Sequence, residues 1–501
     1  MYRKIITSKS LYVIFTLAAI FFLFSFYNRY IEDDEAVLGE YSYYFLHDGI
    51  ARWKTMPAIL DFDTRVYPHH RFFTWTGALI IKVFGWSIYA LKASTLVWYA
   101  IFFLLLYKYF QLTNLENKKK HFVIGAFIIF TAPIILLKSF SFRPDILLMT
   151  EGLATLYFLK RYRVSGAFKN AWIAGGIAGL AFLTHLNGVA FCVTGFFFLI
   201  IFREFKALLF FTISGAIIGG LYFIELLPPG NFDAFIYQLT NWPTVNHGAN
   251  YIEGGFFSII EGRVMKLLSE HQRFFWGDKV IAFSALFIIG LVFNFKALKA
   301  KDKEVLYYIL ILIPALNIFG SHVAERYLLF YYGPMAIIGA VWIYDLQYRK
   351  SALLKIFTTL IVCLHLFFGA KMFFFIHGKS YDTTGTHKEI LASLENPDAR
   401  ILAPYAFIFN ELITYDLYAF KTYEYLQEDL SSPMSQEYFF SKASALGMDY
   451  IIVGREQSET KYMKWIADGE LDPNPFYRIY NKQNDYLILE RIETGLSESS
   501  F

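Results

Sequence analysis

Charged residues and cysteines are both scarce in this chain of 501 residues. Only 18% of the residues are charged, whereas a soluble globular protein has about 25%. Two cysteines occur, Cys192 and Cys363, and both lie in apolar runs, which argues against a disulfide framework and leaves the redox compartment open. There is no internal repeat, no low-complexity stretch and no glycine-rich nucleotide loop, and we expect no nucleic-acid partner.

Apolar and aromatic residues take the place of the missing charges. Hydrophobic residues make up 56% of the chain and aromatic residues 20%, and phenylalanine alone occurs 55 times. This composition indicates a polytopic membrane protein. Because a helix needs about 17–25 apolar residues to cross a bilayer, the apolar runs predict eleven spans, several of them short. They lie near residues 10–27, 87–108, 122–138, 145–160, 171–186, 188–203, 206–226, 279–295, 305–320, 326–345 and 352–376.

Lysine and arginine in the short connections set the orientation of these spans. With the N-terminus inside, every short inside connection is basic, and the outside receives three long segments, 28–86, 227–278 and 377–501. Segment 71–86 is apolar enough to suggest a twelfth span, but that span would move a basic connection to the outside. We therefore predict an interfacial helix there. No small-residue cleavage site follows the first apolar run, so we predict an uncleaved first helix.

The sequence changes character near residue 377. Polar residues return, and the short segments "ARILAPY", "DYIIVG" and "DYLILER" are typical of buried strands. "SQEYFFSKASALGM" between them predicts an amphipathic helix with Ser435 as its N-cap. The predicted fold is therefore a polytopic α-helical membrane domain over residues 1–376, followed by a small α/β domain outside, over residues 377–501.

Four acids, Glu32, Asp33, Asp34 and Glu35, follow the first span directly. Acidic residues do not set topology, so a solvated loop is the simplest explanation of this run. Other polar groups at the outer ends of the predicted spans favour a functional site instead: His69, His70 and Arg71; Arg143 and Asp145; Glu270, His271 and Arg273; and His322, Glu325 and Arg326. Each group also has a structural explanation, as an ion pair at a helix start or an interfacial anchor.

Taken in order, these segments resemble the membrane glycosyltransferases of GT-C architecture. The bacterial relatives of protein O-mannosyltransferases and of the lipid A aminoarabinose transferase are the most similar. The family's first outer loop begins with an Asp-Glu pair, which matches Asp34 and Glu35 in "EDDEAVLGEY". Its Arg-x-Asp at the outer end of a span matches Arg143 and Asp145. "GLAFLTHLNGVAF", "SEHQRFFW" and "ERYLLFYYGPMAI" resemble three further segments, which contain His185, His271, and Arg326 with Tyr327.

The chain departs from the family in "YPHHRFFTWTGALIIKVFG". His69, His70 and Arg71 stand where the family has a Lys or His with paired prolines. The resemblance covers roughly residues 1–345, together with the presence of a C-terminal domain outside the membrane.

The resemblance implies transfer of a sugar from a polyprenyl-phosphate carrier, with inversion, on the outer face of the membrane. The acceptor would be a lipid, a glycan or a protein. Asp34 is expected to be the base that takes the acceptor proton, with Glu35 and Asp145 in the same catalytic set. The leaving phosphate needs positive charge and hydrogen-bond donors. The expected substrate-binding residues are His69, His70, Arg71, Arg143, Arg326 and Tyr327.

The same resemblance implies no required cofactor. A divalent ion held by His271 and Asp33 remains an alternative. The bacterial relatives further imply an inner-membrane protein in contact with membrane lipids, with its N-terminus in the cytoplasm and its C-terminal domain in the periplasm.

Two other classes of function remain open. A transporter would use charges at mid-depth and repeated topology, and only Glu151 and His185 lie away from the span ends. A polysaccharide ligase or polymerase would also use outer Arg and His residues, but does not need an Asp-Glu pair after the first span. Composition alone also allows a structural membrane protein.

Overall fold

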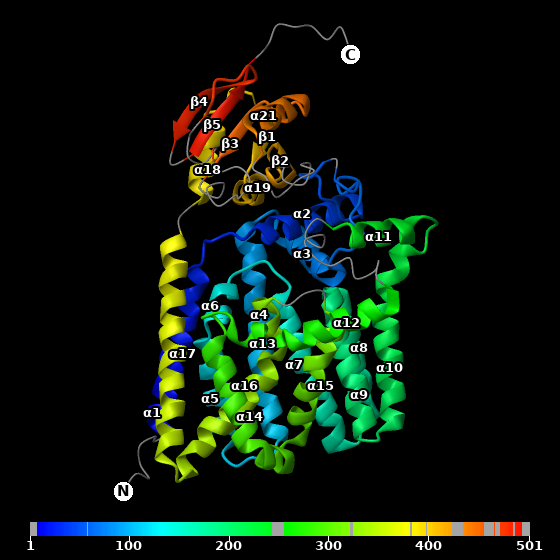
Figure 1. Ribbon diagram of the computed structural model, residues 1–501, viewed down its shortest axis with the longest axis vertical. Coiled ribbons are helices and arrows are strands. Elements are labelled where there is room, and N and C mark those ends of the chain that lie inside the picture. The colour runs from blue at the N-terminus through cyan, green and yellow to red at the C-terminus, as the bar shows by residue number, and fades with distance from the viewer. Residues whose placement is uncertain are drawn as a thin grey trace.

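The computed structural model places a helical bundle below a small sheet domain (Figure 1). It describes residues 8–57, 59–242, 255–320, 324–380, 383–396, 398–422, 434–454, 465, 471–483 and 486–492. The N-terminal helix starts at the end of the bundle opposite the sheet domain (Figure 1). His322 lies outside the described residues.

Each of the eleven predicted spans is helical over most of its length. The helices are α1 (Ser8–Phe24), α4 (Ile88–Leu112), α5 (Lys118–Phe130), α6 (Pro133–Lys138), α7 (Asp145–Ser165), α8 (Phe168–Thr184), α9 (Val189–Ile201), α10 (Phe205–Gly220), α14 (Ile281–Lys301), α15 (Lys303–Phe319), α16 (Tyr332–Asp345) and α17 (Ala352–Lys379). Predicted span 122–138 is divided into α5 and α6, because Pro133 opens α6 and has no backbone N–H.

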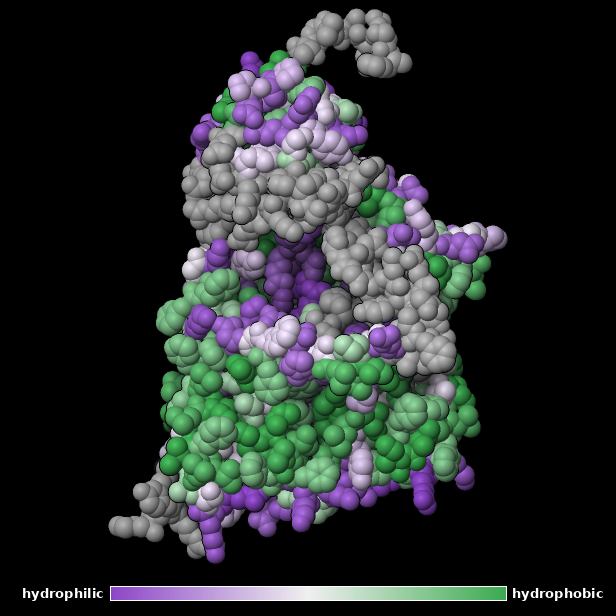
Figure 2. Space-filling model, in the orientation of Figure 1, coloured by the Kyte–Doolittle hydropathy of each residue, from purple (hydrophilic) through white to green (hydrophobic). Residues whose placement is uncertain are grey.

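Six helices in the described part of the chain are long and apolar enough to cross a membrane. They are Lys9–Tyr27, Ile88–Leu112, Phe205–Leu226, Ile281–Lys301, Glu325–Tyr348 and the helical stretch that begins at Ala352. On the face shown in Figure 2, the bundle has a hydrophobic band with hydrophilic residues at both edges. The chain is therefore an integral, multi-pass membrane protein, and the number of eleven spans stays a prediction.

A layer of shorter helices covers the end of the bundle that faces the sheet domain (Figure 1). It contains α2 (Asp33–Asp48), α3 (Arg71–Phe84), α11 (Asn231–Thr240), α12 (Gly255–Leu268) and α13 (Glu270–Phe275). The predicted interfacial segment forms α3, which at 14 residues is too short to cross a bilayer. Gly77 lets α3 approach α2 closely, because a Cβ there would lie 2.2 Å from the Ser42 hydroxyl oxygen.

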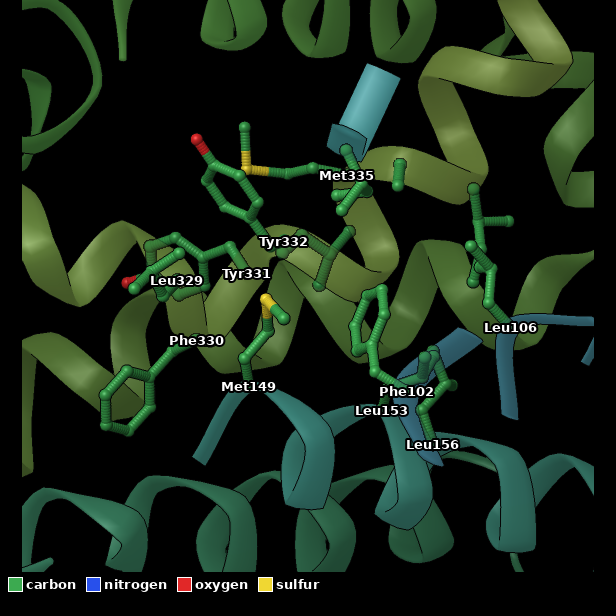
Figure 3. Close-up of a cluster of buried hydrophobic side chains, with 14 of the residues drawn as sticks. Phe102, Leu106, Met149, Leu153, Leu156, Leu329, Phe330, Tyr331, Tyr332 and Met335 are labelled. Atoms are coloured by element: carbon green, nitrogen blue, oxygen red, sulfur yellow. The ribbon is translucent and has the colours of Figure 1, made fainter. Parts of the chain in front are cut away.

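The bundle core fixes the helix ends that carry the candidate site. Figure 3 shows the packing of α7 against α4, the 3-10 helix η4 (Glu325–Tyr331) and α16. The side chains in this contact are Met149, Leu153, Leu156, Phe102, Leu106, Leu329, Phe330, Tyr331, Tyr332 and Met335. Because α7 begins at Asp145 and η4 begins at Glu325, the same contact sets the positions of Asp145 and Arg326 relative to each other.

The C-terminal domain is built on a mixed sheet of five strands in the order β2-β1-β3-β5-β4. The strands are β1 (Arg400–Ala403), β2 (Asp416–Ala419), β3 (Tyr450–Val453), β4 (Tyr477–Gln483) and β5 (Tyr486–Arg491). β1 pairs in parallel with β2 and β3, and β5 pairs in antiparallel with β3 and β4. In the described part of the domain, the helices α18 (Thr383–Ala392), α19 (Tyr405–Glu411) and α21 (Gln436–Ala445) accompany the sheet.

The three predicted strands form β1, β3 and β5, and the predicted helix forms α21. Ser435 caps α21 as expected, because its hydroxyl accepts a hydrogen bond from the Tyr438 N–H. The predicted domain boundary at 376/377 stays a prediction; α17 ends at Lys379 and α18 begins at Thr383.

The C-terminal domain rests directly on α2, the helix that carries the acids. A Cβ at Gly39 of α2 would lie 2.7 Å from the Phe409 ring of α19, so the helices meet closely. Nearby, the Ala419 N–H donates to the Thr55 carbonyl oxygen at 2.8 Å. The buried Glu40 carboxylate in turn accepts from the Thr55 N–H and hydroxyl, at 2.9 and 2.7 Å. The sheet domain is therefore tied to the layer that contains the candidate site.

Candidate active site

The acidic run forms the first turn of α2, where the helix dipole favours negative charge. Glu32 is the N-cap, and it forms a capping box with Glu35. The Glu32 carboxylate also accepts from Lys138 Nζ, at 2.6 and 2.5 Å. This pair joins the start of α2 to the end of α6.

Glu35 is fully buried, and its carboxylate is fully engaged by the protein. It accepts from the backbone N–H groups of Glu32 at 2.8 Å and Phe142 at 2.6 Å. Lys92 Nζ lies 3.4 Å from the same carboxylate. Glu35 therefore connects α2, α4 and the segment before α7.

Asp34 points the other way and keeps half of its side chain exposed, 51%. Its carboxylate pairs with Arg143, and Arg326 Nη1 lies 3.4 Å from Oδ2. Desolvation by the surrounding protein raises the pKa of Asp34, but the two arginines outweigh it and lower the pKa to about 2. Asp34 is therefore an ionised, accessible carboxylate at neutral pH.

Arg143 links Asp34 to Asp145. Its Nε donates to Asp145 Oδ2 at 2.8 Å, and its Nη1 pairs with Asp34 and lies 3.5 Å from Glu32 Oε2. Asp145 opens α7 and is almost completely buried. One planar guanidinium thus holds three carboxylates around it, in the geometry for which arginine is suited.

Asp33 and His271, the expected metal ligands, have separate partners. Asp33 is exposed and lies 3.5 Å from Lys421 Nζ of the C-terminal domain. The His271 Nδ1 lies 2.8 Å from the Leu268 carbonyl oxygen, and its ring contacts Trp276. Within the described ranges, no group of three or more His, Cys, Asp or Glu side chains could hold a metal ion. The metal pair stays a prediction, and the mechanism below uses no metal.

His69 and Arg71 are buried around a carboxylate that the sequence analysis did not identify. Arg71 Nη1 lies 2.6 Å from Glu225 Oε2, and its guanidinium lies over the Tyr222 ring, 4.3 Å from the ring centre. His69 Nε2 lies 3.6 Å from the same oxygen. Glu225 belongs to the 3-10 helix η3 (Leu221–Leu226), inside an apolar run that predicts only a span.

His70 has a different neighbour from His69. Its ring stacks on the ring of His185, with 4.4 Å between centroids and 20° between planes. His185 also meets the Tyr327 ring edge-on at 5.9 Å, and the Arg326 guanidinium lies 5.4 Å from the Tyr327 ring centre. A column of stacked groups therefore runs from His70 to Arg326, which pairs with Asp34.

A cavity of about 620 Å³ opens beside the acids. Its polar lining contains Tyr30, Glu32, Lys138, Asp278, Lys279, Glu325, Arg326 and Lys371, and its apolar lining contains Pro133, Ile134, Leu137, Ala324, Phe368, Met372 and Phe375. Figure 2 shows a hydrophilic hollow between the bundle and the C-terminal domain. The cavity thus joins cationic side chains to apolar walls supplied by α6 and α17 at the outer end of the bundle.

The comparisons with known proteins agree with this fold. Residues 69–225 match the family described as dolichyl-phosphate-mannose-protein mannosyltransferase. ArnT from Cupriavidus metallidurans, in a crystal structure with undecaprenyl phosphate, has 10% sequence identity and a TM-score of 0.60; the match covers 98% of this chain and 99% of ArnT. The oligosaccharyltransferase AglB from Archaeoglobus fulgidus, solved with an inhibitory peptide and a dolichol-phosphate, has 13% identity and a TM-score of 0.53, covering 90% and 70%.

At these identities the likeness to the two structures shows the fold. No curated protein sequence matches the chain. Together with the family match, the fold confirms the predicted resemblance to GT-C membrane glycosyltransferases. Residues 69–225 thus match a glycosyltransferase family, and the chain shares its fold with ArnT, a structure solved with undecaprenyl phosphate.

Proposed function

We propose that the protein transfers a sugar from a polyprenyl-phosphate donor to an acceptor hydroxyl, with inversion, on the outer side of the membrane. The acceptor is a lipid, a glycan or a protein. The observation that carries the proposal is Asp34, an ionised and half-exposed carboxylate that lies 3.4 Å from Arg326, which lines the cavity together with Lys138. A base and a phosphate-binding region thus lie side by side.

The donor phosphate binds in the polar part of the cavity. Lys138 and Arg326 line it together with Lys279 and Lys371. Charge-assisted hydrogen bonds from such groups to a phosphate are stronger than neutral ones. The apolar residues of α6 and α17 line the same cavity, and they suit an isoprenoid chain that extends toward the membrane.

Asp34 acts as the base in the transfer step. The acceptor hydroxyl gives its proton to Asp34 as its oxygen forms the bond to the anomeric carbon, and the bond to the phosphate oxygen breaks. The cations of the cavity stabilise the charge that develops on the phosphate. Attack from the side opposite the phosphate inverts the anomeric carbon.

Donor binding also raises the pKa of Asp34 and so makes it a stronger base. Arg326 makes only a long contact with Asp34, 3.4 Å, and it lines the donor cavity. A phosphate that draws Arg326 toward itself weakens one of the two interactions that lower the pKa of Asp34. Asp34 then becomes a stronger base only when the donor is present.

The other residues of the expected set hold the site in place. Asp145 orients Arg143, whose Nε bonds to it at 2.8 Å. Glu35 fixes the start of α2 through its two backbone N–H donors. Arg71 and His69 hold α3 against Glu225.

The proposed location is the inner membrane of a bacterium, with the N-terminus in the cytoplasm and the C-terminal domain in the periplasm. Two features support this orientation. Basic residues gather in the short connections at one end of the bundle, and the sheet domain lies at the other end (Figure 1).

A donor panel tests the proposed function. The purified protein in detergent is given polyprenyl-phosphate sugars that differ in the sugar, together with an extract of envelope acceptors, and release of polyprenyl phosphate is followed. Nucleotide sugars with the same sugars serve as the control. Consumption of one polyprenyl-phosphate donor, and of no nucleotide sugar, is the expected result. If no polyprenyl-phosphate donor is consumed, the proposal is wrong, and a ligase or a transporter becomes the favoured function.

A further inference from the structure

Asp34 must release the proton that it takes from the acceptor before it can act as the base in the next turnover. A second base nearby would receive this proton and return Asp34 to its ionised form. The stacked pair of His70 and His185 lies among the charges of the site, and no step described above uses it.

The two rings of the pair are not equivalent. His185 Nδ1 accepts a hydrogen bond from the Asn187 N–H at 3.0 Å, so neutral His185 carries its proton on Nε2 and would lose this bond on protonation. A tight turn fixes this arrangement, because a Cβ at Gly188 would lie 2.0 Å from the Ala181 carbonyl oxygen. His70 Nδ1 is buried and, within the described part of the chain, has no hydrogen-bond partner. His70 is therefore the ring that can accept a proton.

The surroundings of His70 keep it neutral at rest. It is the N-cap of α3, where the helix dipole disfavours positive charge. The pKa of His70 is lowered to about 4, chiefly by burial and also by the neighbouring His69 and Arg143, while Asp34 and Asp145 act in the opposite direction. The titratable and charged groups around it are His69 and Arg71 on its own segment, Asp34 on α2, Arg143 and Asp145 at the start of α7, His185 at the end of α8, and Arg326 beyond Tyr327.

We propose that His70 Nδ1 receives the acceptor proton from Asp34 during each turnover, with His185 as the stacking partner that holds the His70 ring. In the first step the acceptor O–H bond breaks and its proton goes to Asp34, while the acceptor oxygen bonds to the anomeric carbon. The electron pair of the bond between the anomeric carbon and the phosphate oxygen leaves with the phosphate. The proton then passes to His70 Nδ1 and from there to bulk water. This role depends on the proposed function.

The ring column also explains why the proton site is coupled to Arg326. Stacking from His70 through His185 and Tyr327 reaches the Arg326 guanidinium, which contacts Asp34. The pair could therefore act through packing alone, and the experiment must separate packing from proton transfer. Phenylalanine at position 70 keeps a ring but has no nitrogen, and alanine removes both.

The test measures kcat and donor KM across the pH range from 4 to 9, in the full-length protein with the donor that the wild type consumes. We expect His70→Phe to lower kcat about tenfold, less than the roughly 10²–10⁴-fold effect of a direct general base, with little change in donor KM. Added imidazole should restore part of the kcat of His70→Ala, and the restored rate should follow the concentration of neutral imidazole. His185→Phe, which keeps both ring contacts, should retain most of the wild-type kcat.

Two results would overturn the role of His70. One is a wild-type kcat and pH profile in His70→Phe. The other is a lower kcat in His70→Ala that added imidazole does not restore, together with a wild-type kcat in His70→Phe. That pattern would show that only the stacking of the ring matters. An inactive wild type would instead overturn the proposed function, and this role with it.

Discussion

Glu35 and Asp34 are neighbours in the sequence with opposite surroundings, and replacing Glu35 by glutamine tests this difference. Glu35 accepts two backbone N–H groups and lies 3.4 Å from the buried Lys92. A glutamine has only one acceptor oxygen, so its NH₂ group must face one of these N–H donors. The substitution also removes the charge opposite Lys92.

The expected cost follows from these contacts. A buried donor left without an acceptor costs about 1–3 kcal/mol, and breaking a buried ion pair costs about 3–5 kcal/mol. Lys92 still donates to the Tyr30 carbonyl oxygen at 2.6 Å, which favours the lower end of this range. We expect Glu35→Gln to lower the free energy of unfolding by about 3 kcal/mol. With an unfolding entropy of about 2 cal/mol/K per residue, the Tm falls by roughly 3 °C.

The assay is thermal unfolding of the purified protein in detergent, followed by tryptophan fluorescence at a fixed scan rate. Asp33→Asn is the matched control, because its side chain is exposed and the substitution should change the free energy of unfolding by less than about 0.5 kcal/mol. If Glu35→Gln melts with the wild type and nevertheless loses transfer, Glu35 takes part in the chemistry and our assignment of its role is wrong.

Three further predictions concern the cavity, the domain contact and α3. Lys138→Gln should raise the donor KM about tenfold, since a hydrogen bond to a charged group contributes about 1.5–3 kcal/mol; an unchanged KM in a donor titration would remove Lys138 from the phosphate site. Burial raises the pKa of Glu40 to about 7 against the hydrogen bonds from Thr55. The protonated Glu40 therefore contributes its full stabilisation below about pH 4.5, and this stabilisation, at most about 3 kcal/mol, is lost as the pH rises through 7. The Tm of the wild type should fall from pH 5 to pH 8, and the Tm of Glu40→Gln should fall less. Arg71→Ala should lower the Tm and leave the donor KM unchanged, because Arg71 is buried against Glu225; the reverse pattern would make Arg71 a substrate-binding residue.

The sequence was sufficient to locate the long helices of the bundle, α3, α21 and the buried strands, but not the shorter helices α2, α11, α12, α13, α18 and α19. Long apolar runs predict spans directly, and β1 and β3, whose residues are mostly or entirely buried, read as short apolar segments. Strands β2 and β4 were missed, since β2 alternates and β4 is mainly exposed. A period of two over four residues is too short to separate a strand from a loop.

The candidate site was predictable only in part. Charge distribution correctly grouped Asp34, Arg143, Asp145 and Arg326, which the structure brings together at one end of the bundle. It did not separate Asp34 from Glu35, which lie one residue apart and therefore about 100° apart around the helix. Glu225 was missed because one acid in an apolar run carries no pattern. The contact between His70 and His185 joins residues 115 positions apart and follows from helix packing alone.

The central claim is that Asp34 is the base of the transfer reaction, and one comparison tests it most directly. Asp34→Asn and Asp33→Asn are purified beside the wild type, their melting curves are matched, and release of polyprenyl phosphate is measured with the donor that the wild type consumes. Asp33 is the control because it is the adjacent exposed acid, paired with Lys421. The account predicts that Asp34→Asn loses at least about a hundredfold in kcat while Asp33→Asn retains most of it. A folded Asp34→Asn with the kcat of the wild type would contradict the account.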